Sequence, residues 1–124
     1  MATKNLLLSY FFACILLSIQ GSSALGHEVV PTTVEQARSD FETADTELNA
    51  VYRQCIEPDR TTVQAISSLQ QSQRIWVQYR DLNAAAYQTG QSSRKVTKDQ
   101  YYYYAATVIT KSRIQELKTL FLND

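Results

Sequence analysis

The chain of 124 residues carries 12 basic and 12 acidic side chains, so its length fits a single domain and its formal net charge is zero. Nucleic-acid-binding proteins normally carry a basic excess, and this balance argues against a nucleic-acid partner. Three glycines and two prolines are too few for a disordered chain or a turn-rich all-β fold.

Residues 1–26 have the pattern of a secretory signal peptide, with Lys4 ahead of an apolar run from Leu6 to Ile19. Small residues follow at Ser22, Ser23, Ala24 and Gly26. The run of about 14 residues is shorter than the roughly 20 that a membrane-spanning helix needs, so no anchor is expected after cleavage. Cleavage after residue 24 or 26 leaves one domain, residues 27–124, in the periplasm or secreted.

Cysteine and histidine are too scarce in the mature chain for several kinds of site. Cys14 leaves with the signal peptide, so Cys55 has no internal disulfide partner. Cys55 is either a small apolar residue at a helix end or a bridge between two chains of a homodimer. His27, at the cleavage boundary, is the only histidine. No Cys/His metal site or histidine-based triad is therefore expected, no cofactor is expected, and the chain is not expected to be an enzyme.

The first predicted helix begins near Thr32 and ends before Pro58. Thr32 and Glu35 have the spacing of a capping box, and proline disfavours helix in the residue before it. An apolar stripe with alternating spacings of three and four comprises Val34, Ala37, Phe41, Ala44, Leu48, Val51 and Cys55.

The second predicted helix runs from Thr61 to Gln88, with Asp59 or Thr61 as its cap. Its stripe comprises Ile66, Leu69, Gln73, Trp76, Arg80, Asn83 and Tyr87. Three of these seven positions are polar, which packing alone would not select. The segment 89–93 is the main predicted loop, and Arg94, Lys95 and Lys98 follow it.

The third predicted helix begins near Thr97 and continues almost to the end of the chain. One face comprises Tyr103, Ala106, Thr110, Arg113, Leu117 and Leu120, flanked by Tyr102, Ile109 and Phe121. The expected fold class is all-α, a small antiparallel bundle of three main helices.

Arg80 and Arg113 both project from faces that are predicted to be buried. A buried guanidinium needs a carboxylate or carbonyl groups as partners, and Asp40 and Glu47 lie beside the stripe of the first helix. We expect these carboxylates to pair with the arginines, and Gln73 to form hydrogen bonds inside the bundle. Alternatively, one arginine lines a groove that binds an anionic ligand.

Three motifs accompany these helices. The first, A-x-x-x-L-N-x-x-Y, comprises Ala44, Leu48, Asn49 and Tyr52. The second, L-x-x-x-Q-x-x-W-x-x-x-R-D, comprises Leu69, Gln73, Trp76, Arg80 and Asp81. The third, T-x-x-R-x-x-x-L, comprises Thr110, Arg113 and Leu117. In this order they resemble the LprI-like lysozyme-inhibitor family of small secreted or periplasmic bacterial proteins, over about residues 35–120.

This resemblance implies a helical domain, a lysozyme or another cell-wall hydrolase as the protein partner, and a structural polar core. The core residues carried over are Gln73, Trp76, Arg80, Asp81, Thr110 and Arg113. Family members usually have two cysteines expected to bridge the second and third helices, and Ala84 and Ala105 occupy the corresponding positions here. A staple of about 2–4 kcal/mol is then absent, and the polar residues carry more of the helix register.

Two surfaces are candidates for contact with a partner. Asp40, Glu42, Asp45 and Glu47 give the first helix an acidic face that suits a basic target, although such runs are usually only solvated. At most two of the four consecutive tyrosines, residues 101–104, can face the core, which makes Tyr101, Tyr102 and Tyr104 candidate contact residues. The loop at 89–99 lies beside them.

The balanced total charge conceals a division along the chain. Residues 27–59 hold eight acidic and two basic side chains, whereas residues 60–124 hold nine basic and four acidic ones. The resemblance to the LprI-like family makes a secreted protein that occludes a cell-wall hydrolase the favoured function. The alternatives are an immunity protein against a wall-degrading toxin and a non-catalytic envelope stress or virulence interaction protein.

Overall fold

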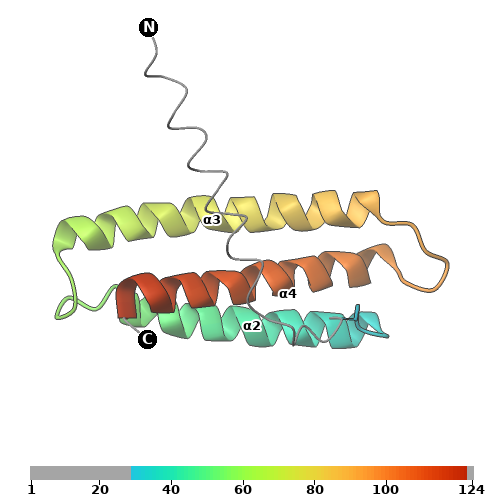
Figure 1. Cartoon of the computed structure of the whole chain (residues 1–124), viewed down its shortest axis with the longest axis horizontal. Coiled ribbons are helices and arrows are strands. Elements are labelled where there is room, and N and C mark those ends of the chain that lie inside the picture. Colours follow the sequence, from blue (N-terminus) through green and yellow to red (C-terminus); the bar gives the residue numbers. More distant parts are fainter. Residues whose placement is uncertain (1–28, 123–124) are drawn as a thin grey trace, which may run out of the picture.

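Three long helices make up the protein, as the computed structural model of residues 29–122 shows (Figure 1). They are α2 (Val34–Cys55), α3 (Val63–Gly90) and α4 (Lys98–Leu117), and a π-helical turn, η1 (Lys118–Leu122), continues α4. Residues 29–122 contain no strand, which confirms the all-α fold class. The predicted signal peptide, Cys14 and His27 lie outside the described residues. No helix within 29–122 is long and apolar enough to cross a membrane.

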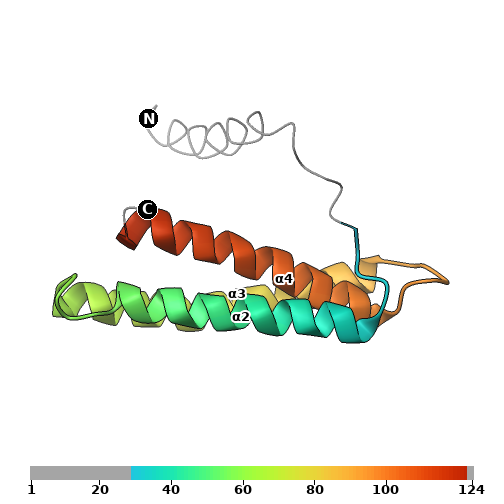
Figure 2. The ribbon, with the colours of Figure 1, turned by 90° about the horizontal axis from the view of Figure 1, so that it is seen from below.

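Helix α4 is the central element of the bundle because it packs against both α2 and α3. Figure 1 shows α4 between the other two helices, each helix running antiparallel to the one before it. In Figure 2, α4 is inclined to α2 and α3 instead of running parallel with them. Because α4 touches both partners, residues on two of its sides are buried.

Threonines begin all three helices. The N-cap residues are Thr33, Thr62 and Thr97, whose side chains accept hydrogen bonds from the backbone N–H groups of Gln36, Ala65 and Gln100. The predicted cap at Thr32 is wrong by one residue, and so is Thr61 as the second cap; the Gln36 side chain donates to Asp40, so the predicted box with Glu35 has no counterpart at Thr33. Both caps lie in Thr-Thr pairs, where either hydroxyl offers the same local chemistry.

The apolar core forms two clusters. The larger one joins α2, α3 and the C-terminal half of α4, and contains Leu48, Val51, Cys55, Leu69, Ile114, Leu117 and Leu122. The smaller one contains Ala84, Ala105 and Ala106, with Phe41 and Tyr102 packed against it. Ala84 and Ala105 thus lie in one cluster between α3 and α4, where the family resemblance places paired cysteines.

Two ends of the predicted stripes are wrong. Asn83 and Tyr87 are exposed, and Ala84 is buried in their place. A straight α-helix drifts by about 20° every seven residues relative to a strict three-four repeat, so a stripe extended along α3 leaves the buried face. Leu120 is also exposed while Leu122 is buried, because the wider turn of η1 changes which residues face α2.

Cys55 lies in the core at the last residue of α2 and is only 2% exposed. Its Sγ atom is 3.9 Å from the carbonyl oxygen of Leu117, which accepts a weak S–H hydrogen bond. Burial raises the pKa of the thiol, although the charges of Arg113 and Arg60 oppose this. A disulfide between two chains would require this helix end to open, so the structure favours the packing role over the bridging role.

Candidate functional site

Arg80 lies at the centre of a polar network between α2 and α3. Its Nη1 atom is 2.8 Å from Oδ1 of Asp45, and its Nε atom is 2.8 Å from Oδ1 of Asp81. The guanidinium also lies 5.0 Å from the ring centroid of Phe41 and 5.4 Å from that of Trp76. Two carboxylates and two aromatic faces therefore compensate the desolvation of a side chain that is 10% exposed.

The carboxylate partner of Arg80 is not one that the sequence predicted. The sequence pattern puts Asp45 on the solvated acidic face and favours Asp40 and Glu47 as partners of the arginines. Asp40 instead accepts a hydrogen bond from Gln36, and Glu47 pairs with Lys118 of η1. Asp45 and Glu47 are two positions apart in the sequence, so they lie about 160° apart around α2, and the edge with Asp45 faces α3.

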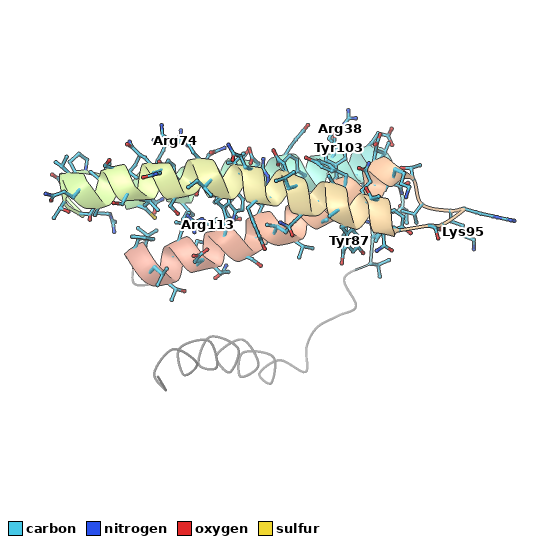
Figure 3. The ribbon with its side chains drawn as sticks, turned by 90° about the horizontal axis from the view of Figure 1, so that it is seen from above. Arg38, Arg74, Tyr87, Lys95, Tyr103 and Arg113 are labelled. Carbon is cyan, nitrogen blue, oxygen red and sulfur yellow. The ribbon has the colours of Figure 1, made fainter. Side chains whose placement is uncertain are left out.

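Arg113 of α4 forms the second part of the network. Its Nε atom donates to Gln73 at 3.2 Å, its Nη2 atom donates to Ser72 at 3.1 Å, and its Nη1 atom is 2.8 Å from Glu116. Figure 3 shows Arg113 between α4 and α3. Because its donors are directed to neighbours within the bundle, Arg113 is poorly placed to hold an anionic ligand.

Trp76 connects the two arginines. Its ring centroid lies 5.4 Å from the guanidinium carbon of Arg80 and 5.9 Å from that of Arg113. The block Q-x-x-W-x-x-x-R-D therefore forms one continuous strip of contacts that reaches α2 through Asp45 and α4 through Arg113. Such a network connects α3 to both of the other helices, and it need not add net stability.

Two further motif residues lie beside this strip. Asn49 donates to Asp45 through Nδ2 at 3.3 Å and so helps to orient the carboxylate that holds Arg80. Thr110 is fully buried in α4, and its Oγ1 atom has no hydrogen-bond partner among residues 29–122. The motif residues thus serve the interior of the bundle more than its surface.

The consecutive tyrosines pack mainly along the surface of the bundle. Tyr101 is only 9% exposed, which makes it unavailable to a partner, contrary to the prediction. The ring centroids of Tyr101 and Tyr87 are 6.1 Å apart, and those of Tyr104 and Tyr87 are 6.0 Å apart. Tyr102 is half-buried, and burial together with the charge of Asp81 raises the pKa of its hydroxyl. Tyr102 and Tyr104 remain candidates for partner contact.

The segment between α3 and α4, residues 91–97, extends beyond the ends of the helices (Figure 1). Lys98 anchors it, since its ammonium group donates to the carbonyl oxygens of Gln88, Thr89 and Gln91 at 2.9, 3.4 and 2.5 Å. The carbonyls of Gln88 and Thr89 belong to the last turn of α3 and that of Gln91 to its C-cap residue, and a cation is favourable at such a helix end. The sequence predicts Lys98 only as part of a basic loop. The signal that could have revealed this role is the position of a lysine a few residues after the end of a helix.

Helix α3 carries an exposed apolar strip that is absent from the predicted contact surfaces. Ile75, Tyr79 and Leu82 are each more than half exposed. Their spacing of four and three residues places them on one side of the helix, and this periodicity was the available signal. The 28 residues of α3 contain three charged side chains in all, so the strip has few charged neighbours on its own helix.

The three helices, the arginine network and the anchored loop define a small helical domain with a polar core. Within residues 29–122 no cluster of three or more His, Cys, Asp or Glu residues could hold a metal ion. The family model for the lysozyme inhibitor LprI matches residues 27–117, and the chain belongs to this family. No curated protein and no solved structure is significantly similar to the chain.

Proposed function

We propose that this protein binds a lysozyme or a related cell-wall hydrolase in the periplasm or outside the cell and blocks its substrate cleft. Membership of the lysozyme inhibitor LprI family is the observation that carries this proposal. The arginine network supports it, because a frame held by contacts among all three helices keeps its surface in one shape. A preorganised surface loses less conformational freedom on binding.

Fewer acidic side chains of α2 are available to a basic target than the sequence indicates. Asp40, Asp45 and Glu47 all have side-chain partners within the bundle. Of the four predicted acidic contact residues, Glu42 alone has no side-chain hydrogen bond or ion pair within residues 29–122. Of these four, only Asp45 and Glu47 are in ion pairs within that range, so the acidic face offers a basic target the charges of Glu42 and of Asp40, whose partner Gln36 is neutral.

Inhibition is tested by titrating the purified protein against a panel of lysozymes while measuring the clearing of a peptidoglycan suspension. Calorimetry on the same pairs measures binding directly. We expect hydrolysis by at least one enzyme to stop at a stoichiometric dose. Unchanged hydrolysis at a large molar excess, with no heat of binding for any enzyme, would overturn the proposal.

A second candidate function is a non-catalytic interaction protein of the envelope. The exposed strip of Ile75, Tyr79 and Leu82 favours it, because contiguous apolar surface on a soluble domain often marks a protein contact. Sedimentation of the purified protein over a range of concentrations, with and without Leu82→Glu, tests it. Association that the substitution abolishes would support this function, and a monomer at all concentrations would contradict self-association.

A further inference from the structure

The loop of residues 91–97, called the basic loop below, is anchored at both of its ends. Lys98 joins it to three carbonyl groups at the end of α3. On the α4 side, Thr97 and Gln100 form a reciprocal capping box, and the Gln100 side chain also donates to the carbonyl of Pro31 at 2.9 Å. Hydrogen bonds at both ends already restrict the conformations of this loop. Ordering it on binding therefore costs less entropy than ordering a loop without such bonds.

The tip of the basic loop carries two uncommitted cations. Arg94 and Lys95 are exposed, and the side chain of neither forms a hydrogen bond or ion pair within residues 29–122. Arg80, Arg113 and Lys118, by contrast, are all paired with carboxylates. Figure 3 shows Lys95 at the far end of the loop, pointing away from the helices.

The shape of the basic loop suits entry into a narrow cleft. Ser92 and Ser93 have small side chains, and the backbone N–H of Lys95 donates to Oγ of Ser93 at 3.0 Å, which tightens the tip. A loop of this length that leaves and returns reaches about 10 Å, given roughly 3.3 Å per extended residue. The long side chains of Arg94 and Lys95 extend this reach further.

The chemistry of a glycoside hydrolase supplies the complement to this tip. Such enzymes normally hold two carboxyl groups on either side of the bond they cleave, roughly 5–10 Å apart. Two adjacent cations on a loop can each form an ion pair with one of these carboxyl groups. A guanidinium pairs with a carboxylate through two parallel hydrogen bonds. Exclusion of water from the cleft strengthens these interactions.

We propose that the basic loop enters the substrate cleft of the target hydrolase and that Arg94 and Lys95 bind its two catalytic carboxyl groups. This inference rests on the proposed function, because it requires a hydrolase as the partner. It assigns the contact to the basic end of the molecule instead of the acidic face of α2. Inhibition is then competitive with substrate and weakens as salt concentration rises.

The test compares two full-length variants with the same change in charge. R94E/K95E reverses the tip of the basic loop, and R53E/R74E reverses two exposed arginines on α2 and α3 that have no side-chain partner within residues 29–122. We expect the loop variant to weaken inhibition by at least about 30-fold, as for loss of an interface hot spot, and the control to change it by less than about 3-fold. Circular dichroism verifies that both variants fold.

A second measurement identifies the group that the loop contacts. In the target, the catalytic acid is replaced by glutamine, and binding of the wild-type protein and the loop variant is measured by calorimetry. We expect the replacement to weaken binding of the wild type and not to weaken binding of the loop variant, whose glutamates no longer face a carboxylate, and this difference is the signature of direct coupling.

The two levels of the proposal fail in different ways. If the wild-type protein inhibits and R94E/K95E inhibits equally well, the assignment of the basic loop is wrong and the proposed function stands. The assignment is equally wrong if a substrate-like oligosaccharide and the protein bind the enzyme together. If the wild-type protein inhibits no hydrolase, the proposed function itself fails.

Discussion

Replacing Asp45 by asparagine should lower the free energy of unfolding by about 1–2 kcal/mol, a value that lies between those of exposed and buried ion pairs. The Arg80 side chain is 10% exposed, whereas that of Asp45 is 38% exposed, so water screens one partner and not the other. Asp81 remains 2.8 Å from the same guanidinium and keeps part of its charge balanced. The loss is therefore smaller than the 3–5 kcal/mol typical of a fully buried pair.

Arg80→Met tests the same network from its other side. Methionine keeps much of the aliphatic stem but removes the partner of two carboxylates and the cation over Phe41 and Trp76. Both carboxylates are exposed enough to be hydrated again, so we expect a loss of about 2–3 kcal/mol. With Asp45→Asn already present, Arg80→Met should cost about 1 kcal/mol less, because the two residues are in direct contact.

Urea unfolding followed by circular dichroism at 222 nm measures these values, since most of residues 29–122 are helical. Glu42→Gln is the matched control, because Glu42 lies on α2 and its carboxylate has no partner within residues 29–122. It should change stability by less than about 0.5 kcal/mol. An Asp45→Asn loss no larger than that of the control, or additive losses in the double variant, would refute the reasoning.

Three further predictions concern the bundle interface, the core thiol and the loop anchor. The disulfide in oxidised A84C/A105C should raise the free energy of unfolding by about 3 kcal/mol, because it closes a loop of roughly 20 residues. Reductant should abolish this gain. A variant that forms no disulfide would contradict the close approach of α3 and α4. Because burial raises the pKa of Cys55 in the folded state, stability should fall as pH rises above the unfolded thiol value of about 8.5, and Cys55→Val should lessen this fall. The native thiol should also react slowly with a disulfide reagent until urea opens the helix end. Lys98→Met should cost about 1 kcal/mol and speed hydrogen exchange in residues 91–97, and unchanged exchange would show that Lys98 does not anchor the loop.

The helix ends follow local signals in the sequence, and the N-terminal caps do so to within one residue. Pro58 correctly predicted an end to the first helix, and Thr97 correctly predicted the start of the last, because both signals act on the local backbone. The adjacent Thr32 and Thr33 offered the same local signal, and only the observed hydrogen bond distinguishes them. Errors of one residue at caps are therefore intrinsic to local patterns.

The amino-acid sequence by itself determined the three helices, the presence of arginines on buried faces and the membership of the LprI family, since these depend on local spacing and motif order. The partner of each arginine depended on more. Whether Asp45 or Glu47 meets Arg80 is decided by how α2 is rotated about its own axis, since Asp45 faces Arg80 of α3 and Glu47 faces Lys118 of η1.

That rotation arises from packing of all three helices together, so no single stripe encodes it. The same reason explains why the side chain of Lys98 is hydrogen-bonded, whereas those of Arg94 and Lys95 have no partner within residues 29–122. Lys98 comes within reach of the carbonyl groups at the end of α3 only after α3 and α4 have packed side by side. Tertiary structure thus divided one basic segment into an anchor and an exposed tip.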